Sequence, residues 1–274
     1  MKGPQFKGGG LRVYALIYLL FLYAPIILLP LFAFNSSTII AFPLEGFTTQ
    51  WFAELTEVEA LHDALWNSLF VAIITAVFAT CLGMFAARAG VMHRFPGKGP
   101  IMGLIMLPLV LPEVIVAVSL LVVAINVLGI GLSLWTIIAA HTLICMPFSI
   151  AILNSAFQNL DASLEEAAID LGETRWSSFR LVTLPLIAPG IIASLLIAFT
   201  ISLDEFIIAF FLTGGEPTLP VYIWGLLRFP ARIPVVMALG TLLVLASILL
   251  LTIAEIYRRR GVRRAGQNDS GGFL

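Results

Sequence analysis

Six long apolar runs, none of which contains Lys or Arg, constrain the fold of this chain more than any other feature. They cover about residues 13–34, 69–87, 101–125, 134–153, 190–212 and 235–256. Each run has roughly the length, about 20 residues, that an α-helix needs to cross the hydrocarbon core of a bilayer. Charged residues make up only 11% of the chain, against about 25% in average soluble domains. The sequence therefore predicts an all-α integral membrane protein with six transmembrane helices.

The Lys and Arg residues between the runs predict the orientation of these helices, because short cytoplasmic loops are enriched in both residues. With the N-terminus inside, thirteen basic residues lie on the inner side, and only Arg228 and Arg232 lie on the outer side. Both termini are then cytoplasmic. The chain divides into a cytoplasmic N-terminus (residues 1–12), a six-helix transmembrane domain (13–257) and a basic cytoplasmic tail (258–274). The inner basic residues are Lys2, Lys7, Arg12, Arg88, Arg94, Lys98, Arg175, Arg180, Arg258, Arg259, Arg260, Arg263 and Arg264.

The sequence contains no pattern that indicates covalent chemistry. Gly97-Lys98-Gly99 is only a fragment of a phosphate-binding loop, since the preceding glycine and the final Ser or Thr are missing. The three histidines are scattered, and the two cysteines, Cys81 and Cys145, lie inside apolar runs, so neither a metal site nor a disulfide is predicted. We expect a non-enzymatic chain without its own cofactor and without a nucleic-acid partner. Any transport must then be driven by a partner or by an ion gradient.

The longest polar segment between two apolar runs, residues 163–189, predicts two short helices at the cytoplasmic surface. Ser163 and Glu166 have the spacing of a capping box, and Gly172 can end the first helix in a left-handed conformation. The second helix is predicted at about residues 174–181, and two proline dipeptides should interrupt the chain before the fifth run. The apolar side chains of the first helix share one face at i, i+3, i+4 and i+7. They are Leu164, Ala167, Ala168 and Leu171.

This segment resembles the EAA loop of permease subunits in binding-protein-dependent ABC importers. The resemblance is carried by Glu166-Ala167-Ala168, then Gly172, then Val182-Thr183-Leu184-Pro185, with Val182 in place of the usual Ile. It implies the type I importer permease fold, with residues 161–188 as the coupling loop that rests on a partner ATPase. An ordinary cytoplasmic connector is the alternative. The implied contacts with the ATPase are Glu165, Glu166, Ala167, Ala168, Asp170, Leu171, Gly172 and Arg175.

Further positions resemble the second permease of spermidine/putrescine-type transporters. This resemblance implies a multi-pass protein of the bacterial inner membrane that pairs with a second permease, two ATP-binding subunits holding ATP and Mg, and a periplasmic solute-binding protein. The implied substrate is a polyamine or related organic cation, and another small solute, such as an amino-acid derivative or an opine, is the alternative. A stand-alone secondary transporter would instead show internal repeats. The positions are Phe34-Asn35-Ser36, Trp51-Phe52, Leu107-Pro108, Leu111-Pro112-Glu113, Ala140-His141, Pro147-Phe148, Ser202-Leu203-Asp204-Glu205-Phe206, Leu219-Pro220-Val221, Ile223 and Ala238-Leu239.

Three carboxylates, Glu113, Asp204 and Glu205, lie deep in the predicted spans. Because a charged side chain costs about 2.5–3.5 kcal/mol at a helix centre on insertion scales, each must face the bundle interior or a partner. We assign them to a substrate pathway for a cation. Glu113 could instead hydrogen-bond backbone freed by Pro112. Since adjacent helical residues point about 100° apart, at most one of Asp204 and Glu205 should face the pathway, while the other pairs across an interface or caps a broken helix.

Overall fold

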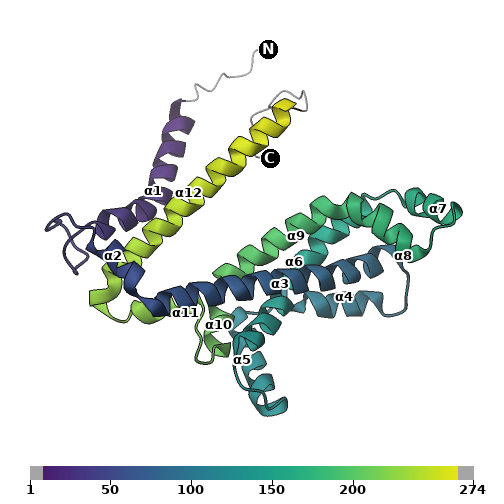
Figure 1. Ribbon diagram of the computed structural model, residues 1–274, viewed down its shortest axis with the longest axis horizontal. Coiled ribbons are helices and arrows are strands. Elements are labelled where there is room, and N and C mark those ends of the chain that lie inside the picture. The colour runs from purple at the N-terminus through teal and green to yellow at the C-terminus, as the bar shows by residue number, and fades with distance from the viewer. Residues whose placement is uncertain (1–8, 265–274) are drawn as a thin grey trace. The chain divides into compact units, whose positions relative to one another are not determined.

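The computed structural model describes residues 9–264, and almost all secondary structure in this part of the chain is α-helical (Figure 1). The predicted all-α architecture is confirmed. The helices form two compact units, one built from the described residues up to Glu59 together with those from Ile223 onward, the other from residues 60–222. The outer parts of the predicted terminal segments, residues 1–8 and 265–274, lie outside the described residues.

The first unit is built on two long apolar helices, α1 (Gly9–Ala33) and α12 (Ile233–Arg264), which pack side by side (Figure 1). A Cβ atom at Gly240 would already touch the Leu29 side chain at 3.4 Å, so the small residue permits this close approach. The short helix α2 (Gln50–Glu57) packs against α12. An ion pair between Glu54 and Arg232 ties α2 to the turn that precedes α12.

The second unit is a bundle whose centre consists of α3 (Glu59–Met92), α6 (Leu134–Gln158) and α9 (Leu184–Asp204). Shorter helices complete it: α4 (Lys98–Met106), α5 (Glu113–Val122) and α10 (Ile207–Leu212). Fully buried side chains from α3, α6 and α10, among them Val71, Ile137 and Ile208, form its main apolar core. The helix α11 (Leu219–Leu226) then carries the chain from this unit to the first.

The third apolar run is broken, whereas a single span was expected. Helix α4 continues through a 3-10 turn at Leu107–Leu109, and the path bends by 104° before α5 begins at Glu113. Pro112 stands at the N-cap of α5, where its missing N–H is not needed inside the helix. A proline also disfavours helical geometry at the residue before it, which explains why the break lies here.

The segment before the fifth apolar run also differs from its prediction, because Pro185 and Pro189 do not interrupt the chain there. Helix α8 (Arg175–Ser178) passes through a π-helical turn, Phe179–Thr183, directly into α9. The wider π turn lies where Pro185 would otherwise crowd the carbonyl four residues earlier, so the helix accommodates the ring. The helix ends instead at Asp204, and α10 begins three residues later.

Five helices of the described chain are long and apolar enough to cross a membrane, and the broken pair α4–α5 brings the number to six. The amino-acid pattern thus predicts the number of spans, and the breaks are set by prolines and by the carboxylates discussed below.

We predict that Gly83→Leu destabilises the second unit. A Cβ atom at Gly83 would lie 2.7 Å from the Ser149 Cβ atom of α6, so a larger side chain must push α3 and α6 apart. Overpacking of this kind costs about 1–3 kcal/mol. Thermal unfolding of the detergent-solubilised protein should show a lower midpoint. Gly103→Leu is the matched control, since nothing lies within 4 Å of a Cβ atom there. Equal midpoints for the two variants would contradict the close helix contact.

Candidate functional site

The polar segment after α6 forms a compact two-helix element at one end of the second unit (Figure 1). Its first helix is α7 (Ala162–Asp170). The predicted capping box at Ser163 and Glu166 is wrong, because the N-cap is Asp161, whose carboxylate accepts the Ser163 amide at 3.0 Å. An Asp two residues upstream competes successfully for the free amides of the first turn. Hydrogen bonds from the hydroxyl and the amide of Ser163 hold the pKa of Asp161 below its usual range.

The predicted glycine stop of α7 is confirmed. Gly172 adopts φ +95°, the left-handed region that favours glycine. Its amide donates to the Ile169 carbonyl at 2.9 Å, and the Glu173 amide donates to the Ala168 carbonyl at 3.1 Å. These two bonds make up a Schellman motif, which satisfies carbonyls at the end of the helix and turns the chain into α8.

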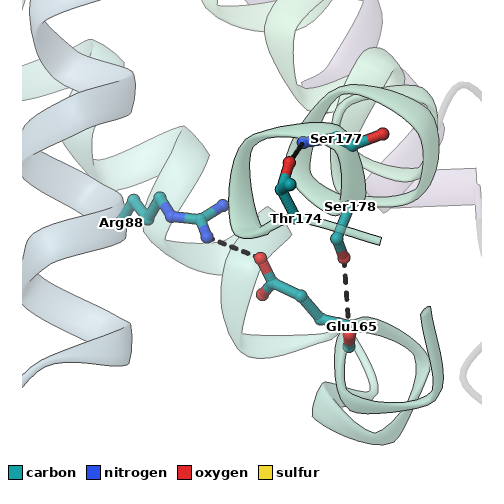
Figure 2. Close-up of polar contacts among 5 residues, drawn as sticks. All are labelled: Arg88, Glu165, Thr174, Ser177 and Ser178. Carbon is teal, nitrogen blue, oxygen red and sulfur yellow. Dashed lines mark hydrogen bonds and ion pairs between the residues drawn. The ribbon is translucent and has the colours of Figure 1, made fainter. Parts of the chain in front are cut away.

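The element is attached to the bundle through Glu165, which points toward the end of α3 (Figure 2). Its carboxylate forms an ion pair with Arg88 at 2.5 Å, and both side chains are largely shielded from solvent. The Arg88 guanidinium also lies 4.5 Å from the centre of the Phe179 ring, a cation–π contact. The Ser178 hydroxyl donates to the Glu165 carbonyl at 3.4 Å, which joins α8 to α7.

Arg88 and Phe179 are structural anchors that sequence reasoning missed. Arg88 was used only for the topology, and nothing in the sequence links it to Glu165, 77 positions later. The predicted topology places Arg88 and the acidic loop on the same side of the membrane, but it does not indicate which side chains meet.

The remaining residues assigned to the ATPase contact lie on the outer surface of the element or at its edge. Glu166, Ala167, Asp170 and Arg175 are exposed, and Ala168 is half-buried. Leu171 is 88% exposed and Trp176 of α8 is 67% exposed, although both are large apolar side chains. The apolar face predicted for α7 is therefore only partly covered within the described chain. The element presents an apolar and acidic surface, and on its opposite side the ion pair between Glu165 and Arg88 attaches it to α3.

A second group of predicted residues lies at the two helix breaks of the bundle. Helices α5 and α10 pack together in the apolar core, and Glu113 begins α5 while Glu205 directly precedes the N-cap of α10. Glu113 is exposed, and its place in the first turn of α5 is electrostatically favourable.

Asp204 and Glu205 have different environments, as the sequence argument requires. Glu205 is only 9% exposed, and its Oε1 atom accepts the amide of Ile208 at 2.6 Å. It thereby satisfies a backbone donor that the start of α10 would otherwise leave free. Asp204 is exposed and forms no hydrogen bond or ion pair within the described chain. Glu205 is thus the carboxylate that caps the broken helix.

A buried polar pair lies next to this break. His141 of α6 is fully buried, and its Nδ1 atom is 2.8 Å from the Ser202 hydroxyl of α9. The pair joins the two helices in the last turn before Asp204. It therefore fixes the position of the helix end from which Asp204 and Glu205 diverge.

Comparison with known proteins gives a consistent result. Residues 79–265 match the family described as "Binding-protein-dependent transport system inner membrane component". The chain is 33% identical to the spermidine/putrescine transport system permease protein PotC of Escherichia coli over 94% of this chain and 96% of that protein. It is 37% identical to the putrescine transport system permease protein PotI of Escherichia coli, over 89% and 92% of the two chains.

A solved structure shares the fold. A chain of a bacterial ABC transporter involved in the import of the acidic polysaccharide alginate superimposes with a TM-score of 0.72. The superposition covers 94% of this chain and 99% of that chain at 16% sequence identity. The predicted type I importer fold is confirmed for the overall arrangement of the helices.

We predict that Gly172→Val loosens α7 and α8. A β-branched residue at positive φ costs about 1–2 kcal/mol, so the Schellman hydrogen bonds should open more often. Hydrogen–deuterium exchange of the peptide covering residues 162–178 should be faster than in the parent protein. Gly172→Asn should give an intermediate rate, because Asn tolerates the left-handed region. Gly215→Val is the control, since this loop glycine has no positive φ and open space around it. Unchanged exchange in Gly172→Val would show that the glycine is dispensable.

Proposed function

The chain belongs to the family of binding-protein-dependent transport system inner membrane components, and on that basis we propose that it forms half of the translocation pathway for a small organic cation. It is a permease subunit of an ABC importer. The observation that carries the substrate proposal is the pair of exposed carboxylates, Asp204 and Glu113, at helix breaks inside the membrane domain. A cation that crosses low-dielectric surroundings needs fixed negative charge along its route.

The names of the relatives support the same substrate class, since both are polyamine permeases that align with nearly the whole chain. Putrescine or spermidine is the proposed cargo. Glu113 and Asp204 are the proposed pathway residues. Glu205, in this proposal, acts on the pathway indirectly by holding the start of α10.

We assign coupling to the two-helix element of α7 and α8. Its exposed apolar and acidic residues would contact the ATP-binding subunit, while the Arg88–Glu165 ion pair transmits movement to α3. Glu165 is therefore proposed as an internal link, and Glu166, Ala167, Asp170, Leu171 and Arg175 as the contact itself. Gly172 and Ala168 shape the turn between the helices.

The partners follow from the family description, which names a binding-protein-dependent system. We propose a complex of this chain with a second permease, two ATP-binding subunits and a periplasmic binding protein, in the bacterial inner membrane with both termini cytoplasmic. ATP and Mg would be bound by the ATP-binding subunits. This chain itself would catalyse no reaction.

Reconstitution tests the importer proposal. We expect the isolated chain to hydrolyse no ATP, because it lacks a phosphate-binding loop. Liposomes that contain the whole complex should take up radiolabelled putrescine only with ATP inside and the binding protein outside. ATP hydrolysis by the isolated chain would contradict the subunit assignment. A binding protein that retains only neutral or acidic solutes would contradict the polyamine proposal and leave the importer intact.

We predict opposite behaviour for the two adjacent carboxylates. Asp204→Asn removes a charge that nothing within the described chain balances, so the KM for putrescine uptake should rise about tenfold, the equivalent of about 1.4 kcal/mol. Glu205→Gln should keep most uptake, because the amide oxygen can still accept the Ile208 amide. Glu205→Leu leaves that buried amide without a partner, at a cost of about 1–3 kcal/mol, and should lower the yield of assembled complex.

Assembly, measured by size-exclusion chromatography of the purified complex, is the control for all three variants. Unchanged KM in an assembled Asp204→Asn complex would remove Asp204 from the pathway. Loss of uptake in an assembled Glu205→Gln complex would show that the Glu205 charge, and not its capping bond, is required.

A further inference from the structure

Hydrogen bonds near its two ends close the loop between α1 and α2, residues 35–47. Asn35 is 2% exposed; its side-chain oxygen accepts the Glu45 amide at 3.1 Å, and its carbonyl accepts the Trp51 indole N–H at 2.7 Å. The Ser36 amide donates to the Gly46 carbonyl at 3.1 Å. Asn35 and Phe47 form an isolated antiparallel bridge. These bonds close the loop at the end of α1 and give it a defined shape.

The loop folds back against the helix from which it emerges. The Phe42 ring lies 5.4 Å from the ring of Phe32, which is in the last turn of α1. The Phe47 ring stacks on Phe34 at 5.0 Å with an interplanar angle of 4°. These contacts place both aromatic residues of the loop level with the end of α1. The two aromatic side chains of the loop are therefore held against the end of the helix.

The largest side chains that the loop turns outward are apolar, and Glu45, beside its base, is exposed as well. Ile39 is 67% exposed, Phe42 is 66% exposed and Phe47 is 81% exposed. Residues 35–44 contain no charged side chain. Large apolar side chains that share one exposed surface are unfavourable in water and mark a contact with a partner or a membrane.

We propose that this loop inserts into the boundary between lipid headgroups and acyl chains, in the leaflet where α1 ends. By the distribution of Lys and Arg this is the outer leaflet. Helix α1 is apolar and exposed within this chain over nearly its whole length, and this apolar surface continues directly into the loop. Aromatic side chains at the end of a span occupy the membrane interface, and a neutral apolar segment gains free energy there.

A bilayer fits this surface better than a soluble protein does. Glu45 is the acidic residue of the loop, next to its hydrogen-bonded base, and Glu57 and Glu59 lie beyond the loop, around the end of α2. The loop offers neutral side chains at residues 35–44, most of them Ser, Thr or apolar groups. It would anchor α1, α2 and the start of α12 at the interface and keep the outer end of this unit at constant depth.

Fluorescence quenching in lipid nanodiscs tests the insertion. The full chain with Cys81→Ser would carry an environment-sensitive nitrobenzoxadiazole label at Ile39→Cys or, in a second variant, at Leu44→Cys. Cys145 is fully buried and stays unlabelled. Glu57→Cys, at the exposed end of α2, is the matched aqueous control. The nanodiscs contain phosphatidylethanolamine and phosphatidylglycerol, with and without a nitroxide on the upper acyl chain, and iodide is the aqueous quencher.

We expect the nitroxide lipid to quench the labels at positions 39 and 44 several-fold more than the control label, and iodide to quench them several-fold less. Either label with this pattern supports the insertion, provided that the variant is monodisperse. Labels at both positions that iodide reaches as readily as the control label would overturn it. Shielding that appears only after the periplasmic binding protein is added would also overturn it, because the loop would then be a protein-docking surface.

Discussion

The need to satisfy every backbone hydrogen-bonding group inside a membrane is the constraint on which this structure depends. An α-helix meets it within one segment, and each unsatisfied group in hydrocarbon costs several kcal/mol. The long helices α3, α6, α9 and α12 follow directly from this rule. The helix ends inside the membrane domain need a separate explanation, because the backbone N–H and C=O groups freed there must find other hydrogen-bond partners. Pro112 removes the need for one donor at the start of α5, and Glu205 supplies an acceptor at the start of α10.

The carboxylates of the membrane domain also lie at these helix ends. Glu113 and Glu205 lie at the two breaks, at the starts of helices α5 and α10, which pack against each other in the core. Of the two, only Glu205 accepts a hydrogen bond from a backbone amide within the described chain. The neighbouring Asp204 accepts none there. A broken span therefore provides both an irregular backbone and an available carboxylate. This combination suits a route for a cation better than an unbroken apolar helix would.

The two-helix element of α7 and α8 is held to the bundle on one side only. Its inner side is fixed by one ion pair, one cation–π contact and one hydroxyl bond, all from Arg88, Glu165, Phe179 and Ser178. Its outer side remains apolar and exposed, with Leu171 and Trp176 the largest side chains. A contact surface for another subunit needs exposed side chains on an element whose opposite side is held in place, and this element has both. The loop at the end of α1 has a similar design, with a hydrogen-bonded base and an apolar outer surface.

The sequence by itself determined the class of fold, the number of spans and the place of the two-helix element in the chain, because long apolar runs and a glycine stop act locally. It also determined that Asp204 and Glu205 must differ, since neighbouring helical residues point in different directions. Tertiary structure decided which of them is buried, through the packing of α10 on α5 and α6. It likewise decided that Arg88 meets Glu165 and that the chain passes Pro185 and Pro189 without a break. Such features depend on contacts between residues far apart in the chain or on a local widening of the helix, and neither is encoded in the spacing of apolar residues.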